Sequence, residues 1–412
     1  MAARTDYSGP VLFSFGFRPF FLGACLFALA VIPAWLLIWQ GKLEYRGPFV
    51  ATDWHIHEML FGYGAAVVAG FLFTAVPNWT GRMPARGWPL ALLSGLWLLG
   101  RLAAAGWLGL PPLGVMVVDC AFLAAVIAMI AREIIAGENW RNLKVLVPVT
   151  LLGVANACFH IEAMTEGAAD VSRRLGIAVL IFLIMLIGGR IIPSFTRNWL
   201  AKQGSEKRPV PFGKFDAVTL VSGAAALLAW TAAPWSAVSG ALLLLAGLLH
   251  ALRLARWCGL ASLREPLLFM LHAAYAMIPA GLAAAGAVPF GLLAPAAAGH
   301  ILGIGAIGGM TLAVMMRATM GHSGRPLVAG PLLATSFALV LGAAALRLAG
   351  SAELAAEWDG ISVAAGLWTA GFALMLAKTG PWLVTRRLGP KKAGGKQEPG
   401  PEHAPAASVK PV

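Results

Sequence analysis

Long apolar runs recur along the whole chain and limit its fold more than any other feature of the sequence. A helix that crosses the roughly 30 Å hydrocarbon core of a bilayer needs about 20 apolar residues and satisfies every backbone polar group internally. The chain contains twelve such runs. It is therefore expected to be an all-α, polytopic membrane protein, a bundle of twelve transmembrane helices near residues 17–39, 56–77, 88–108, 112–131, 143–164, 175–195, 214–234, 237–257, 265–285, 289–316, 327–349 and 361–384.

The composition agrees with a helical bundle in lipid. Hydrophobic residues make up 59% of the chain and charged residues only 12%, whereas about 25% of an ordinary soluble domain is charged. The 48 glycines allow helix backbones to approach closely in a membrane. The four cysteines lie far apart and form no CxxC or CxxCH motif, so neither a disulfide framework nor c-type haem attachment is indicated.

The cations lie mainly in short segments between the apolar runs and predict the orientation of the chain. Arg82 and Arg197 are examples, whereas the alternate segments carry acids such as Glu162. By the positive-inside rule both termini are cytoplasmic, in a bacterial inner membrane. The net charge of +13 thus reflects topology and does not indicate nucleic-acid binding. Residues 1–388 are expected to form one transmembrane domain, and residues 389–412 a disordered cytoplasmic tail.

Internal repeats are common in transporters, but this chain offers only weak traces of them. The segments 77–82, 193–197 and 317–325 resemble one another at the ends of the second, sixth and tenth apolar runs. A shared cationic composition at one membrane face explains this similarity equally well.

Most histidines lie within or beside the apolar runs, where an ionisable group indicates a function, and five of them are the candidate site residues. His55 and His57 open the second run, and His160 closes the fifth run on the same, periplasmic side. His272 and His300 lie roughly 10–12 Å and 15–17 Å into the ninth and tenth runs, so both are expected near the midplane. We therefore expect two cofactor or metal sites, one with the first three histidines and one with the last two. The alternative for each histidine is a hydrogen bond to a neighbouring carbonyl or polar side chain.

The spacing of His55 and His57 is informative because helical residues two positions apart point about 200° from each other. The two side chains cannot readily bind one ion, but they can face two different cofactors. Back-to-back histidines on one helix serve two haems in haem-copper oxidases, which is an analogy of geometry alone. The argument requires that the helix begin before His55.

Further polar residues interrupt the apolar runs, and they include Glu58, Arg101, Asp119 and Arg190. Glu58 and Asp119 are the expected catalytic residues, because a carboxylate inside a membrane can carry protons inward. The alternative is that these four residues form structural ion pairs. His250, which lies near Arg253, is interpreted as structural.

Several long motifs of this sequence resemble the NnrS family. They are Phe15-Gly16-Phe17-Arg18-Pro19-Phe20-Phe21, Asp53 to Gly62, Ala75 to Gly81, Gly189 to Asn198, Leu271 to Tyr275 and His300 to Pro326. The likeness keeps the same order from about Phe13 to Val384. The resemblance implies a haem- and copper-containing membrane protein that is tied to nitric oxide metabolism, but it does not assign the ligands.

These features lead to the hypothesis that the chain binds haem b, with copper as a second candidate cofactor. It is expected to reduce nitric oxide to N2O and so to protect against nitrosative stress. Quinol in the lipid bilayer is the expected electron donor. Two other functions stay open. One is a non-catalytic haem protein that senses or scavenges nitric oxide, and the other is a transporter of a metal, haem or small solute, which clear two-half symmetry would have favoured.

Overall fold

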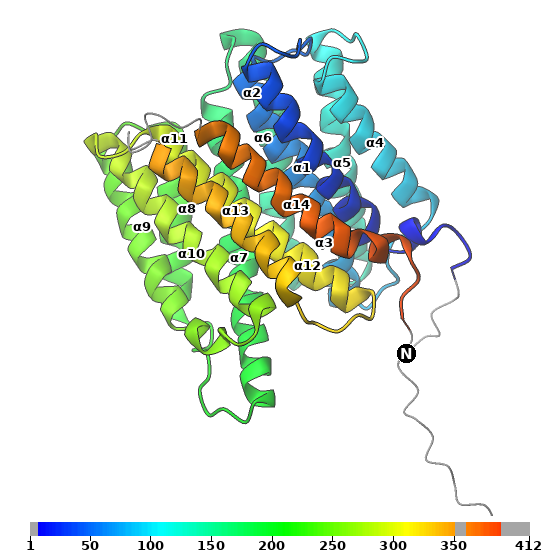
Figure 1. Ribbon diagram of the computed structural model, residues 1–412, viewed down its shortest axis with the longest axis vertical. Helices are drawn as coiled ribbons and strands as arrows, with labels where there is room; N and C mark the ends of the chain where they lie inside the picture. Colours follow the sequence, from blue (N-terminus) through cyan, green and yellow to red (C-terminus); the bar gives the residue numbers. More distant parts are fainter. Residues whose placement is uncertain (1–6, 351–359, 389–412) are drawn as a thin grey trace, which may run out of the picture.

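The computed structural model describes residues 7–350 and 360–388, and within these ranges it is a bundle of helices without strands (Figure 1). The tail expected at residues 389–412 lies outside the described residues. In chain order the elements are η1 (Val11–Ser14), α1 (Phe17–Trp39), α2 (Ala51–His57), η2 (Glu58–Gly64), α3 (Ala65–Thr80), α4 (Trp88–Ala104), α5 (Pro112–Ala136), η3 (Trp140–Val145), α6 (Leu146–Glu166), α7 (Val171–Lys202), α8 (Lys214–Ala232), α9 (Ala237–Ala255), η4 (Gly259–Ser262), α10 (Pro266–Ala287), η5 (Val288–Phe290), α11 (Pro295–His300), η6 (Ile301–Gly308), α12 (Gly309–His322), α13 (Gly330–Gly350) and α14 (Gly360–Val384).

Most of these helices have the length and composition of membrane spans. In the described part of the chain, eleven helices or continuous helical runs are long and apolar enough to cross a bilayer. The helix expected near residues 88–108 is α4, which is apolar but only 17 residues long. The all-helical, multi-pass architecture is therefore confirmed, whereas the twelfth crossing and the cytoplasmic location of both termini stay predictions.

Proline and glycine set several helix boundaries. Three helices begin at a proline, namely Pro112, Pro266 and Pro295. Proline lacks an amide hydrogen, and the first residue of a helix does not need one because its amide has no acceptor within the helix. Several expected boundaries were inaccurate by up to seven residues. The second run begins at Ala51 instead of residue 56, and the sixth covers Val171–Lys202 instead of 175–195. The tenth begins at Pro295 instead of residue 289, because residues 288–294 form a short 3-10 helix and a turn.

The helices form three consecutive groups, α1–α5, α6–α9 and α10–α14, which close into a ring. The last helix of each group packs against the first helix of the next, since α5 contacts α6, α9 contacts α10 and α14 contacts α1. Figure 1 shows α1 and α14, from opposite ends of the chain, side by side. The helix α7 contacts both η2 and η6, so it packs against the second and the tenth spans.

The segments η2 and η6 are π-helical and continue directly from α2 and α11. A π-helical turn is wider than an α-helical turn and is frequent at functional sites. The indole of Trp97 in α4 donates a hydrogen bond of 2.9 Å to the carbonyl of Gly62 in η2. This contact fixes the start of the second span, where His57 and Glu58 lie.

Candidate metal centre

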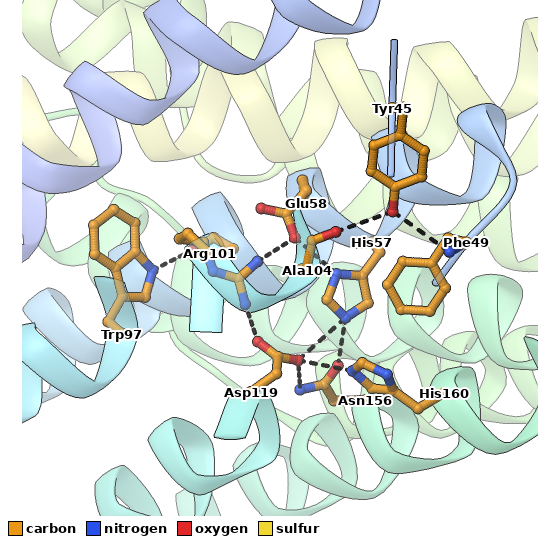
Figure 2. A network of polar contacts seen from close by, with 11 residues as sticks. Tyr45, Phe49, His57, Glu58, Trp97, Arg101, Ala104, Asp119, Asn156 and His160 are labelled. Atoms are coloured by element: carbon orange, nitrogen blue, oxygen red, sulfur yellow. Dashed lines mark hydrogen bonds and ion pairs between the residues drawn. The ribbon is translucent and has the colours of Figure 1, made fainter. Parts of the chain in front are cut away.

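Six buried polar residues meet between the first two groups of helices (Figure 2). They come from α2, η2, α4, α5 and α6, and they are His57, Glu58, Arg101, Asp119, Asn156 and His160. Ionisable groups are expensive inside a membrane unless they pair or serve a function. The convergence of five such groups and one amide from five elements thus marks the main candidate site, which we call the His57 cluster.

Three residues of the His57 cluster can bind one metal ion. The ligand atoms of His57, Asp119 and His160 all lie within 4.8 Å of one another. The Oδ2 atom of Asp119 lies 3.2 Å from Nε2 of His57 and 3.1 Å from Nε2 of His160. Two imidazoles and one carboxylate form a donor set that suits iron(II) and related first-row metals, while imidazole also suits copper.

Asn156 and Glu58 orient the ligands. Asn156 donates from Nδ2 to Asp119 Oδ2 at 2.8 Å, and its Oδ1 lies 3.0 Å from His57 Nε2. The Nε2 atom of His57 therefore faces two oxygen acceptors, and the space between them suits a proton or a metal cation. On the other side of the ring, His57 Nδ1 lies 2.9 Å from Glu58 Oε1, which is the carboxylate contact that commonly orients a metal-binding imidazole.

Arg101 compensates the two acids of the cluster. Its Nη1 donates to Glu58 Oε1 at 2.5 Å, and its Nη2 donates to Asp119 Oδ1. Two carboxylates against one guanidinium leave one negative charge when both imidazoles are neutral. A bound metal cation reverses that charge, so the cluster is electrostatically suited to hold one.

Gly62 has no side chain, and this absence leaves room for the guanidinium of Arg101. A Cβ atom at Gly62 would lie 2.7 Å from Arg101 Nη1 and 2.8 Å from Phe27 Cε1. We therefore expect Gly62→Ala to displace the guanidinium and to lower the free energy of unfolding by about 1–3 kcal/mol. Thermal unfolding of the detergent-purified protein measures the loss. Gly95→Ala on α4, where a Cβ would meet no atom within 4 Å, is the matched control, and equal melting temperatures for the two variants would contradict the packing argument.

The loop between α1 and α2 closes the cluster at one end. The ring of Phe49 lies 4.7 Å from that of His57 and 5.0 Å from that of His160, between ring centres. The Tyr45 hydroxyl donates to the Ala104 carbonyl at 3.0 Å and accepts a hydrogen bond from the Phe49 amide. Burial raises the pKa of the Tyr45 phenol, so it stays protonated and holds Phe49 over the two imidazoles.

The structure separates His55 from His57. Both residues lie on α2, which begins at Ala51, so the condition for the back-to-back arrangement is met. His57 points into the cluster, whereas the ring of His55 stacks on Trp35 at 4.4 Å between ring centres. The expected site of three histidines therefore contains only His57 and His160.

The expected pair of His272 and His300 is not formed. His300 lies five positions after Pro295 and His272 six positions after Pro266, on consecutive helices that run in opposite directions. Each histidine is thus about 8–9 Å from the start of its own helix, and the two are near opposite ends of the bundle. The midplane estimate for His300 was wrong because the tenth helix begins later than expected. His272 Nε2 donates to Thr196 Oγ1 at 2.8 Å, since the Thr196 hydroxyl itself donates to Ile192.

A second buried polar cluster lies between the middle and last groups of helices and contains His250. Its Nδ1 lies 2.9 Å from the Tyr275 hydroxyl. Arg253 donates to Tyr275 at 3.1 Å and to Asp216 at 3.0 Å. These contacts agree with the structural interpretation of His250. Arg190 instead donates to Asn142 at 3.4 Å and lies outside the His57 cluster.

Asn156 and Phe49 are site residues that the sequence analysis did not select. Asn156 lies four residues before His160, a spacing that places both side chains on one face of α6, so a signal for it was present. Phe49 comes from a loop, and no periodicity indicates which side chain of a loop turns inward.

The sequence as a whole was compared with known protein families and with curated proteins. A family model described as NnrS protein matches residues 11–387 of this chain, which confirms the resemblance noted in the sequence. No curated protein matches the chain. Membership of this family points to a haem- or metal-binding membrane protein linked to nitric oxide, and the His57 cluster is where the structure offers a metal its ligands.

Proposed function

The chain belongs to the NnrS family, and from that premise we propose that it binds nitric oxide at a metal ion held by His57, Asp119 and His160 and reduces it to N2O. The observation that carries the proposal is the convergence of these three ligand atoms within 4.8 Å. The site suits a single ion of iron or copper more than a haem, because Asp119 Oδ2 and Asn156 Oδ1 lie only 3.2 Å and 3.0 Å from His57 Nε2 and leave no width for a porphyrin there.

The proposed reaction joins two molecules of nitric oxide. A bond forms between the two nitrogen atoms, and one nitrogen–oxygen bond breaks. Two electrons and two protons are consumed, and the products are N2O and one water. A quinol in the bilayer is the proposed reductant, since its oxidation to a quinone releases the two electrons and two protons required. The metal ion supplies a binding position for nitric oxide and a path for electrons.

Glu58 is the proposed proton donor of the site. Its Oε1 accepts hydrogen bonds from Arg101 and His57, while its Oε2 is buried and has no hydrogen-bond partner. No protein donor occupies this oxygen, so it is the atom of the cluster through which a carboxyl group can exchange a proton with a bound substrate. Asp119 acts as a metal ligand in this proposal, and Asn156 positions it.

Anaerobic turnover tests the proposed function. Purified protein is supplied with nitric oxide and a reduced short-chain quinol, and N2O is quantified by gas chromatography while bound iron and copper are quantified by mass spectrometry. We expect N2O from the native protein and none from His160→Ala. The control is His272→Gln, which removes a buried imidazole outside the cluster and is expected to keep the activity. Stoichiometric binding of nitric oxide without N2O favours the sensor or scavenger, and a protein without iron and copper contradicts both.

Phe49 offers a second, smaller test. We expect Phe49→Ala to admit water to the imidazoles and to speed metal loss to a chelator by about tenfold. The rate is followed by stopped-flow absorbance after the chelator is added. Phe212→Ala, at a side chain that is 60% exposed, serves as the control, and identical rates for the two variants would show that Phe49 does not seal the site.

A further inference from the structure

Two spans of the bundle share an unusual local structure. In the first, α2 ends at His57, the π-helical segment η2 follows, and α3 ends just before Gly81, whose φ is +70°. In the second, α11 ends at His300, the π-helical segment η6 follows, and α12 ends just before Ser323 and Gly324, whose φ is +72°. Because π-helices hold well under 1% of residues in proteins, their recurrence in this context is informative.

The two spans correspond at a constant separation of 243 positions. It relates His57 to His300, Gly62 to Gly305, and the pair Gly81-Arg82 to Gly324-Arg325. It also relates Gly87 to Gly330, two glycines with φ of +74° and +65° that precede the next helices α4 and α13. The weak sequence similarity near these helix ends is thus part of a longer repeat, in which His300 takes the place that His57 has in the first group of helices.

The imidazole of His300 is arranged like that of a metal ligand. Its Nδ1 lies 2.6 Å from the Ala296 carbonyl, one turn earlier on α11. A carbonyl only accepts, so Nδ1 carries the hydrogen and Nε2 carries the lone pair. Such a hydrogen bond from the second ring nitrogen to a backbone carbonyl is the usual support of a metal-binding histidine.

The imidazole of His55 complements it. His55 lies on the face of α2 opposite to His57, and its ring stacks on Trp35. Its Nδ1 atom is buried and has no hydrogen-bond partner, which is uncommon for a polar atom in a protein interior. His300 and Arg347 lie within electrostatic range of His55. His55 Nδ1 and His300 Nε2 come from two different spans, and neither has a described hydrogen bond to the protein.

Charge indicates which kind of ligand these histidines bind. The His57 cluster contains two carboxylates, but the charged group near His55 and His300 in the described ranges is the guanidinium of Arg347. A guanidinium repels a bare metal cation and pairs with carboxylates. A haem presents both an iron that takes imidazole ligands and anionic propionates, so it fits this combination better than an isolated ion does.

We propose that His55 and His300 bind one haem as its two axial ligands, with Arg347 neutralising its carboxylates, at a centre separate from the His57 cluster. This inference deepens the proposed function and rests on it for its role: a bound haem would supply a centre for electron storage close to the proposed metal ligands, because α2 carries both His55 and His57. The two histidines would hold the haem, and nitric oxide would be left to the His57 cluster.

Spectroscopy of the purified full-length protein tests this assignment. We expect the ferric protein to give the electron paramagnetic resonance signal of a low-spin, bis-imidazole haem. His55→Gly and His300→Gly should each abolish that signal, and added imidazole should restore it, which a merely structural role does not explain. The matched control is His272→Gly, where the signal should persist. Where a glycine variant does not accumulate, His300→Met should retain haem but replace the bis-imidazole spectrum with that of imidazole and thioether ligation.

The outcomes separate this inference from the proposed function. An unchanged bis-imidazole signal in both His55→Gly and His300→Gly overturns the haem assignment, even if N2O production continues. Loss of the signal in His272→Gly also overturns it, because the structure places His272 away from His55 and His300. Conversely, His160→Ala should lose N2O production and keep the low-spin haem; retained N2O production in that variant counts against the proposed function alone.

Discussion

Arg101→Met is expected to lower the free energy of unfolding by about 3–5 kcal/mol, because removing one partner of a buried ion pair leaves the other charge uncompensated. Two acids lose their partner at once, since Arg101 pairs with both Glu58 and Asp119. Methionine has a similar length and no charge, so packing is largely kept. The loss is measured by thermal unfolding of the metal-free protein in detergent.

A double variant shows whether charge is the cause. Glu58→Gln removes one of the two acids, and in the Arg101→Met background it should restore part of the lost stability, so that the two effects are not additive. If Arg101→Met melts within a degree or two of the native protein, the two carboxylates do not need the guanidinium and our description of the cluster is wrong.

Asp119→Asn is expected to weaken metal binding by about 100-fold or more, since even partners outside the ligand shell contribute 10–100-fold in other metal sites. Asparagine has nearly the same shape but lacks the negative charge that both imidazoles and Arg101 face. Affinity is measured by titrating the metal-free protein with Cu²⁺ or Fe²⁺ in competition with a chelator of known affinity.

The matched control for Asp119→Asn is Asp216→Asn, which alters a buried acid that pairs with Arg253 in the middle group of helices. We expect this control to be destabilised but to bind the metal with native affinity. An equal loss of affinity in both variants would mean that Asp119 acts through stability and not as a ligand.

The sequence predicted the membrane helices well because long apolar runs respond directly to the bilayer. It also predicted that His55 and His57 point apart, since this follows from helical geometry once α2 begins before His55. Hydropathy measures how apolar a run is, but it does not locate the start of a helix. The depth of His300 was therefore misjudged, because Pro295 and the preceding turn start the tenth helix late.

The grouping of the site residues could not be read from the sequence alone. His57, Asp119 and His160 come from three helices, and their meeting depends on how α2, α5 and α6 pack. The π-helical segment after His57 changes the rotation of the helix, and no apolar periodicity signals it. Arg101 and Asp119 were recognised as buried polar residues, but only the packing of α4 on α5 shows that they pair.

The repeat illustrates a different limit. Sequence identity between the second and tenth spans is limited to a few glycines and alanines, one arginine and one histidine, which composition alone can explain. The shared π-helical segments and left-handed glycines are conformational, so they become visible only in three dimensions. They are also the features that relate His300 to His57.

X-ray absorption spectroscopy of the metal-loaded protein tests the central claim most directly. The claim is that His57, Asp119 and His160 hold one ion of iron or copper. We expect, beside any haem iron, one ion per chain with nitrogen and oxygen neighbours and the outer-shell scattering of two imidazoles, and we expect this ion to be absent from His57→Ala and from His160→Ala. If both variants keep the full content of that ion and the same spectrum, the metal lies elsewhere and the account of this site is contradicted.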